Sequence, residues 1–230
     1  MGNHRRFARR EDLGLTRAEF AVLERLDSPR KIQDFIFRLG QNFEERGETC
    51  QTVREVLHTR KAHCIEGAML AACAFWVHGE PPLLLDMRAV QDFDHVVTLY
   101  RRQGRWGTIS KTNGVFLRSR DPVYSTLREL AMSYFHEYCN RREHKTLREY
   151  SLPFDLRRID TQVWVSGKQA WHVAEALDRL RHFKLMNGHH LRLVTRRDPV
   201  ERRAAALKQF PVPRVLVARE QARLQKRRQK

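Results

Sequence analysis

One apolar helix constrains the fold of this chain more than any other feature. After Cys64, apolar residues recur at nearly every turn as far as Trp76, and Gly79 followed by Pro81 and Pro82 ends the run. The run is too short to cross a bilayer, so it predicts a helix that is buried inside a protein. Such a helix needs other elements around it, and we therefore expect it at the centre of the fold.

Three expected strands follow this helix along the chain. The segment from Leu83 to Val90 has the apolar pattern of a strand, and the segment from His95 to Arg102 has it again. Gln103-Gly104 is typical of a tight turn and leads into a strand from Arg105 to Ser110. The order predicts an α+β fold in which the Cys64 helix packs on an antiparallel sheet.

Helix-start signals precede the central helix. Thr16 with Glu19 forms a capping-box pattern, and Ser28 before Pro29 marks a second helix start. Thr52 with its own acidic residue three positions later repeats the capping-box pattern. We expect N-terminal helices that pack around the core.

Composition shifts divide the chain into four expected parts. Residues 1–12 are expected to form a flexible basic arm and residues 13–120 the core. Apolar residues at helical spacing predict that residues 121–213 form a helical extension that packs on this core. Residues 214–230 are rich in Lys and Arg and are expected to be a basic tail.

The net charge is strongly positive, with 44 Lys and Arg against 27 Asp and Glu, giving +17. Two interpretations stay open: solvated Arg-rich faces, or a surface that binds a nucleic acid or an acidic partner. No recognisable nucleic-acid-binding motif decides between them. The hydrophobic fraction of 41% provides enough material for a packed core.

The four cysteines show no paired or dense spacing, and no secretory signal precedes them. We therefore expect no disulfide framework, a cytoplasmic location and no membrane contact, and we expect free thiols. The sequence carries no indication of the oligomeric state. His58, His63, His78 and His136 do not stand at ligand spacing with a Cys or a carboxylate, so we expect no metal and no other cofactor.

Cys64 is the candidate nucleophile because it lies in the first turn of the expected helix. Unpaired N–H groups at a helix start favour a thiolate, and Lys61 and His63 add positive charge nearby. Cys73 lies in the middle of the same helix and is interpreted as a small core residue. A thiolate that attacks a carbonyl also needs an imidazole, and His95 opens a strand further along the chain.

These residues, in this order, resemble the transglutaminase-like core of the papain-like superfamily. The resemblance covers residues 61–110: the helix that starts at Cys64, the strand after Pro81-Pro82, the strand that starts at His95, and Gly104-Arg105-Trp106. It implies that Cys64 is the nucleophile and His95 the base, and that Trp106 corresponds to the tryptophan of the Gly-x-Trp strand of this family.

The chain departs from this family pattern at one position. The pattern has an Asp four residues after the tryptophan, where it orients the histidine, and this chain has Ser110 there. A hydroxyl can accept a hydrogen bond from the ring, but it does not stabilise an imidazolium as a carboxylate does. We rank Ser110 first as the orienting residue and Asn113 second, with Asp94 as a nearby carboxylate.

Three functions follow from this sequence. The first is cysteine-dependent amide or acyl chemistry, as a hydrolase or acyltransferase acting on a protein, peptide or other amide through Cys64 and His95. The second is a catalytically inactive relative that binds a nucleic acid or an acidic partner through its basic surface and tail. The third is a scaffold role.

Glu66 is interpreted as a helix-dipole partner, and the aromatic residues of 134–138 as core.

Overall fold

The computed structural model describes residues 6–218, so most of the expected basic tail and the first five residues of the arm lie outside the described residues. Within this part of the chain, seven strands form one antiparallel sheet in the order β6-β5-β4-β3-β7-β9, with β8 also pairing with β3. Their bounds are β3 Leu83–Ala89, β4 His95–Arg102, β5 Arg105–Ile109, β6 Arg120–Tyr124, β7 Leu147–Ser151, β8 Phe154–Asp155 and β9 His182–Lys184.

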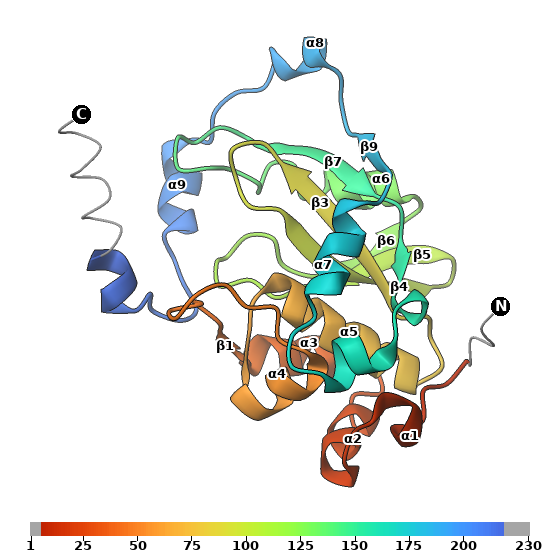
Figure 1. The fold of residues 1–230 in the computed structure, drawn as a ribbon. Helices are drawn as coiled ribbons and strands as arrows, with labels where there is room; N and C mark the ends of the chain where they lie inside the picture. The colour runs from red at the N-terminus through yellow and green to blue at the C-terminus, as the bar shows by residue number, and fades with distance from the viewer. Residues whose placement is uncertain (1–5, 219–230) are drawn as a thin grey trace.

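The helices of the N-terminal half gather around α5 (Cys64–Val77) on one side of the sheet (Figure 1). They are α1 (Arg10–Leu13), α2 (Arg17–Glu24), α3 (Pro29–Arg38) and α4 (Val53–Thr59). A short parallel pair, β1 (Gly40–Gln41) with β2 (Lys61–Ala62), leads directly into α5. The chain is an α+β protein with a helix packed on a mostly antiparallel sheet, as the sequence predicts.

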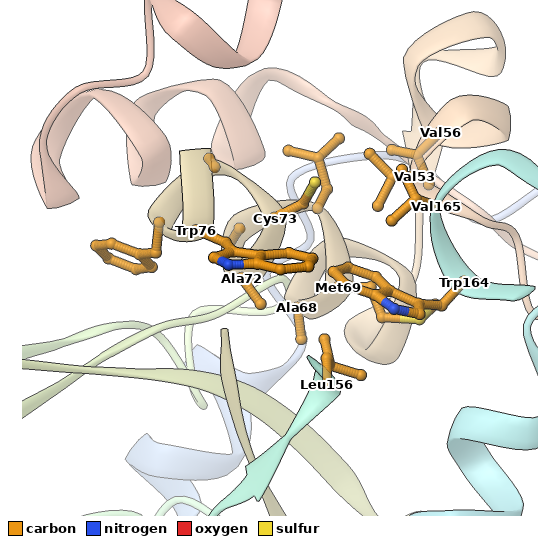
Figure 2. Packing of buried hydrophobic residues seen from close by; sticks show 14 of the residues in the cluster. Val53, Val56, Ala68, Met69, Ala72, Cys73, Trp76, Leu156, Trp164 and Val165 are labelled. Carbon is orange, nitrogen blue, oxygen red and sulfur yellow. The ribbon is translucent and has the colours of Figure 1, made fainter. Parts of the chain in front are cut away.

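Helix α5 is the centre of the main core. Every side chain from Ile65 to Trp76 is buried. The residues packed around it come from α4, the first turn after β8 and the π-helical turn Gln162–Ser166 (Figure 2). Trp76 stacks on Trp164 with ring centroids 6.2 Å apart. A helix that is apolar on every face requires this kind of enclosure.

The opposite face of the sheet carries a second core. Along β4, Val96 and Tyr100 face α5, whereas Val97 and Leu99 face a cluster built on α6 (Leu127–Met132). This alternation is the two-residue period of a strand. The aromatic residues of 134–138 that were interpreted as core, Tyr134, Phe135 and Tyr138, belong to this cluster.

The predicted helix starts are confirmed. The side chains of Thr16, Ser28 and Thr52 each accept a hydrogen bond from the backbone N–H three residues later. Strand β4 has the predicted bounds. Strands β3 and β5 start where predicted, and each ends one residue earlier than its own predicted end. Local sequence signals therefore predict these helix starts and the three central strands.

The expected flexible arm needs a correction. Ala8 is buried and its N–H donates to the carbonyl oxygen of Trp76 over 3.1 Å. Helix α1 starts at Arg10 and buries Leu13. Residues 8–12 are therefore part of the fold, because one helix turn and one backbone contact anchor a segment whose sequence has no apolar period.

The expected helical extension over residues 121–213 was wrong in its main feature. This segment supplies β7, β8, β9 and most of β6, so it completes the sheet. The strands are only two to five residues long and carry little periodicity. Pro122 lies in β6 at the edge of the sheet, where a missing N–H is tolerated. The helices expected here are present as α6 and α7 (Trp171–Asp178), followed by α8 (Gly188–Leu191) and α9 (Pro199–Ala205).

Within residues 6–218, no helix combines the length and the apolar character needed to cross a membrane.

Candidate active site

Cys64 is the first residue of α5, and His63 is its N-cap. The backbone N–H groups at this end of a helix have no partner within the helix, so they favour a negative charge on the nearby sulfur. The hydroxyl of Thr98 on β4 donates to the carbonyl oxygen of Ala68 over 2.6 Å. This contact fixes the first turns of α5 against the strand that starts at His95.

Two imidazoles surround the Cys64 sulfur. Burial opposes the charged form of this thiol, but hydrogen bonds to His63 and His95 outweigh burial and lower the pKa of Cys64 to about 5. The structure therefore brings together the sulfur and the strand histidine that the sequence singles out. At neutral pH the thiol is a thiolate, which is the nucleophilic form.

His95 is buried, and its ring is held by Ser110. The Nε2 atom of His95 lies 2.9 Å from the Ser110 hydroxyl oxygen, and this hydroxyl donates to the carbonyl oxygen of Leu117 over 2.6 Å. Because the serine hydrogen is used on Leu117, the serine oxygen accepts from Nε2–H of His95. The other ring nitrogen, Nδ1, is then left to face the thiol.

The chain around Ser110 is fixed on both sides. The side chain of Gln33 on α3 accepts from the Ser110 N–H and donates to the Ser110 carbonyl oxygen, both over 3.0 Å. On the other side, a Cβ placed on Gly67 would lie 2.7 Å from the Cβ of Lys111. Glycine at position 67 therefore permits the close approach of the Ser110 segment to α5.

Asn113 has a different contact from the one expected of an orienting amide. Its Oδ1 accepts from the N–H of Phe210 over 2.8 Å, and its Nδ2 donates to the Phe210 carbonyl oxygen over 3.0 Å. Asp94 accepts from the N–H of Ala89 over 2.8 Å. The Trp106 ring lies under the guanidinium of Arg101, which is 4.8 Å from the ring centroid. Of the candidate orienting residues, Ser110 is the one in contact with the ring.

Sequence reasoning missed the importance of the pair formed by His63 and Glu66. The Nε2 of His63 lies 3.0 Å from the Thr49 carbonyl oxygen and 3.1 Å from a Glu66 carboxylate oxygen. Both neighbours are acceptors, so Nε2 carries a hydrogen. Burial opposes the charged ring, but hydrogen bonds to Cys64 and Glu66 raise the pKa of His63 well above its ordinary value of 6.5. His63 is thus the cation beside the thiolate.

Glu66 is fully buried and is held by a dense set of donors. Besides His63, these donors are Asn42, Thr49 and the backbone and side chain of Gln51. Burial raises the pKa of Glu66, but its bonds to His63, Gln51 and Asn42 outweigh burial and lower it. The buried carboxylate of the site therefore lies beside the N-cap histidine, His63. The capping-box spacing of His63 and Glu66 was the available signal.

Cys64 and His95 line an open cleft of ≈ 570 Å³. Its walls come from the segment 92–95, the loop 111–117, the segment 137–143 and the chain from Arg197 to Lys208. Gln41 of β1 also lines the cleft; its Nε2 donates to the neighbouring Asn42 carbonyl oxygen over 3.2 Å, and its Oε1 is buried without a partner among the described residues. Sequence reasoning did not identify Gln41, because only the β1–β2 pairing brings it to the site.

The surroundings of the other three thiols disfavour the thiolate form. Burial raises the pKa of Cys50 to about 12, and burial also raises the pKa values of Cys73 and Cys139. Cys64 is therefore the one thiol in the described part of the chain whose surroundings favour the thiolate.

Among residues 6–218, no three His, Cys, Asp or Glu side chains converge as a set of metal ligands.

Comparison with known proteins adds no assignment, because the chain matches no protein-family model and no curated protein.

Proposed function

We propose that the protein performs cysteine-dependent amide or acyl chemistry, as a hydrolase or acyltransferase of the transglutaminase-like type. The observation that carries the proposal is the Cys64 thiol between two imidazoles, with its pKa lowered to about 5. Thiolates paired with histidine in this way attack carbonyl carbons. The open cleft at the sulfur gives a substrate access to it.

The proposed reaction has two stages. In the first, the Cys64 sulfur forms a bond to the carbonyl carbon, and the carbonyl becomes an oxyanion. Before the attack, the proton of the Cys64 thiol passes to Nδ1 of His95; when the bond to the leaving amine breaks, Nδ1 delivers this proton to the departing nitrogen. In the second stage, water or an amine attacks the thioester, His95 takes the proton from this nucleophile, and the Cys64 thiolate is released.

Each neighbouring residue has a defined part in this scheme. Ser110 holds the Nε2–H of His95 and so directs the other nitrogen to the reaction. His63, which is held by Glu66, stabilises the negative charge on the sulfur together with His95. The N–H of Cys64 at the helix start and the second hydrogen on Nε2 of Gln41, whose first is donated to Asn42, are the donors proposed for the oxyanion.

Acylation of the protein by p-nitrophenyl acetate tests this function. We expect release of nitrophenolate and an acetyl group on the Cys64 peptide after an acid quench, detected by mass spectrometry. Cys64→Ala should abolish both signals, whereas Cys73→Ala, at a buried thiol of α5 that does not line the cleft, serves as the matched control and should leave them unchanged. Equal acetylation of Cys64 and Cys139 would contradict the proposal.

The alternative is a catalytically inactive protein that binds a polyanion or an acidic partner. The replacement of the usual Asp by Ser110, together with the net charge of +17, favours it. In that case Cys64 should stay unacylated while salt-sensitive binding persists in the Cys64→Ala variant.

A further inference from the structure

One wall of the catalytic cleft is formed by the C-terminal segment from Arg197 to Phe210, which includes α9. At its beginning, the guanidinium of Arg197 donates to the carbonyl oxygen of Glu137 over 3.1 Å and lies 5.0 Å from the Phe116 ring centroid. At its end, Phe210 is held by the double hydrogen bond to Asn113. The segment is therefore fastened at both ends.

Three of the four acidic side chains that line the cleft are engaged by local donors; the fourth, Glu143, lies 3.8 Å from Arg197, and its Oε2 has no hydrogen-bond partner among the described residues. One oxygen of Glu137 pairs with Arg120 over 2.7 Å, and the other accepts from the N–H of Leu117. Asp92 accepts from the hydroxyl of Thr146 over 2.8 Å. Asp94 is held by its contact with Ala89, described above. These carboxylates therefore have local donors.

The cationic side chains of the cleft are not balanced in the same way. Lys111 is 2% exposed, and its Nζ donates to the Leu39 carbonyl oxygen. The Nζ of Lys208 donates to the Ala205 carbonyl oxygen, and Arg202 is exposed. Among residues 6–218, none of Lys111, Arg202 and Lys208 has a carboxylate within ion-pair distance.

Arg197 is a buried cation with an incomplete partner. Its side chain is 7% exposed, its nearest carboxylate oxygen on Glu143 is 3.8 Å away, and its Nε has no acceptor among the described residues. Burial, together with the positive charge of Arg197, lowers the pKa of Lys208, and burial with the charge of Arg118 lowers the pKa of Lys111 to about 8. Lys111 and Arg197 therefore place buried positive charge at the cleft, and Arg202 and Lys208 add exposed positive charge, which a bound anion would offset.

We propose that the cationic wall formed by Lys111, Arg197, Arg202 and Lys208 binds a carboxylate of the substrate, so that the site acts on acidic peptides or other carboxylate-bearing amides. This inference rests on the proposed function of Cys64, because the wall and the thiol line the same cleft. A carboxylate suits this wall because guanidinium and ammonium groups are its usual partners.

The test compares two alkylating reagents that differ in charge. Iodoacetate and iodoacetamide both react with the Cys64 thiolate through the same carbon, forming a C–S bond with loss of iodide, but only iodoacetate carries a carboxylate. Peptide mass spectrometry measures the rate constant for alkylation of Cys64 by each reagent, and the readout is the ratio of the iodoacetate rate constant to the iodoacetamide rate constant. In the double variant with Arg202→Gln and Lys208→Gln, we expect the ratio of iodoacetate to iodoacetamide to fall by about fivefold.

Two controls make the ratio specific. The double variant with Arg17→Gln and Arg179→Gln removes the same charge from exposed positions that do not line the cleft, and its ratio should match that of the unmodified protein. The variant with Arg202→Lys and Lys208→Arg retains both charges and should keep the high ratio. Equal ratios in the two neutralised double variants would overturn the inference.

Further outcomes distinguish a failure of the carboxylate-binding inference from a failure of the proposed function of Cys64. If iodoacetamide alkylates Cys64 no faster than Cys139, the proposed function fails and the inference fails with it. If Cys64 reacts fast but the ratio does not respond to the wall, the inference alone fails. Succinate at constant ionic strength should protect Cys64; protection by a DNA oligonucleotide but not by succinate would assign the wall to phosphates and overturn the carboxylate proposal.

Discussion

The hydroxyl oxygen of Ser110 accepts a hydrogen bond from Nε2 of His95, 2.9 Å away, while its own hydrogen is used on a carbonyl oxygen. A neutral group therefore fixes the tautomer of the candidate base. The carboxylate of the site, Glu66, lies beside the second imidazole, His63, and not beside the candidate base. This division of roles explains how the site favours a thiolate although the group that orients His95 is a neutral hydroxyl.

Substitutions of Ser110 test the first part of this arrangement. Ser110→Ala should lower the rate of acyl transfer by about 10-fold to 100-fold, because His95 loses the acceptor that orients it. Ser110→Thr keeps the hydroxyl and should retain most of the rate. Ser110→Asp should not raise it, since a carboxylate would face the Leu117 carbonyl oxygen, which needs a donor. Nitrophenyl-ester turnover measures all three, and a more active Asp variant would contradict this geometry.

The pair of His63 and Glu66 should control the charge of the thiol. In His63→Gln, the pKa of Cys64 should rise towards its ordinary value, because the thiolate loses its adjacent cation. Glu66→Gln should produce a smaller rise and a loss of about 1–3 kcal/mol in the free energy of unfolding, because charge-assisted hydrogen bonds are lost. Thiolate absorbance in the ultraviolet follows the pKa. His172→Gln, on the exposed side of α7, is the control, and an unchanged thiol pKa in His63→Gln would exclude this role.

Gln41 should act on the transition state. Gln41→Ala is expected to reduce kcat by about 10²-fold with little change in KM, because an oxyanion donor binds only when charge develops on the carbonyl oxygen. The control variant Gln162→Ala alters an exposed amide outside the cleft and should have no effect. A change confined to KM would assign Gln41 to substrate binding instead.

The thiolate and the imidazolium should leave a signature in the pH dependence of stability. The pKa of Cys64 is about 5 in the folded protein against an ordinary 9.0, so its contribution is absent below about pH 5 and grows as the pH rises to 9.0. The raised pKa of His63 gives a contribution that is complete below pH 6.5 and declines above it. The two slopes oppose each other between 6.5 and 9.0.

The expected result is a rise in the free energy of unfolding between about pH 5 and 6.5, by roughly 1–2 kcal/mol, and then a plateau up to about pH 9. The readout is the difference in unfolding free energy between the unmodified protein and the double variant with Cys64→Ala and His63→Gln in urea titrations, because the other titrating groups largely cancel. A difference that stays constant across this interval would show that Cys64 does not ionise with a lowered pKa in the fold.

Local signals in the sequence predicted the framework of the site but not its full membership. The caps at Thr16, Ser28 and Thr52 and the strand from His95 depend on neighbouring residues, so the sequence shows them directly. The small strands after Pro122 are too short to carry a period, and sheet pairing rather than local preference makes them strands.

Contacts between distant segments could not be predicted. Gln41 reaches the cleft only because β1 pairs with β2, and Asn113 holds Phe210 across a separation of 97 residues. Neither relationship has a local sequence pattern. His63 was seen as a nearby charge, but its ring orientation towards Cys64 and Glu66 depends on the Thr49 segment that packs against it.

The most direct test of the central claim is the pH dependence of alkylation of Cys64 by iodoacetamide, resolved from the other cysteines by peptide mass spectrometry. The account predicts a half-maximal rate near pH 5 for Cys64, while the raised pKa of Cys139 places its half-maximal rate above pH 9.0. A half-maximal rate for Cys64 near pH 9.0 would contradict a thiolate held by His63 and His95.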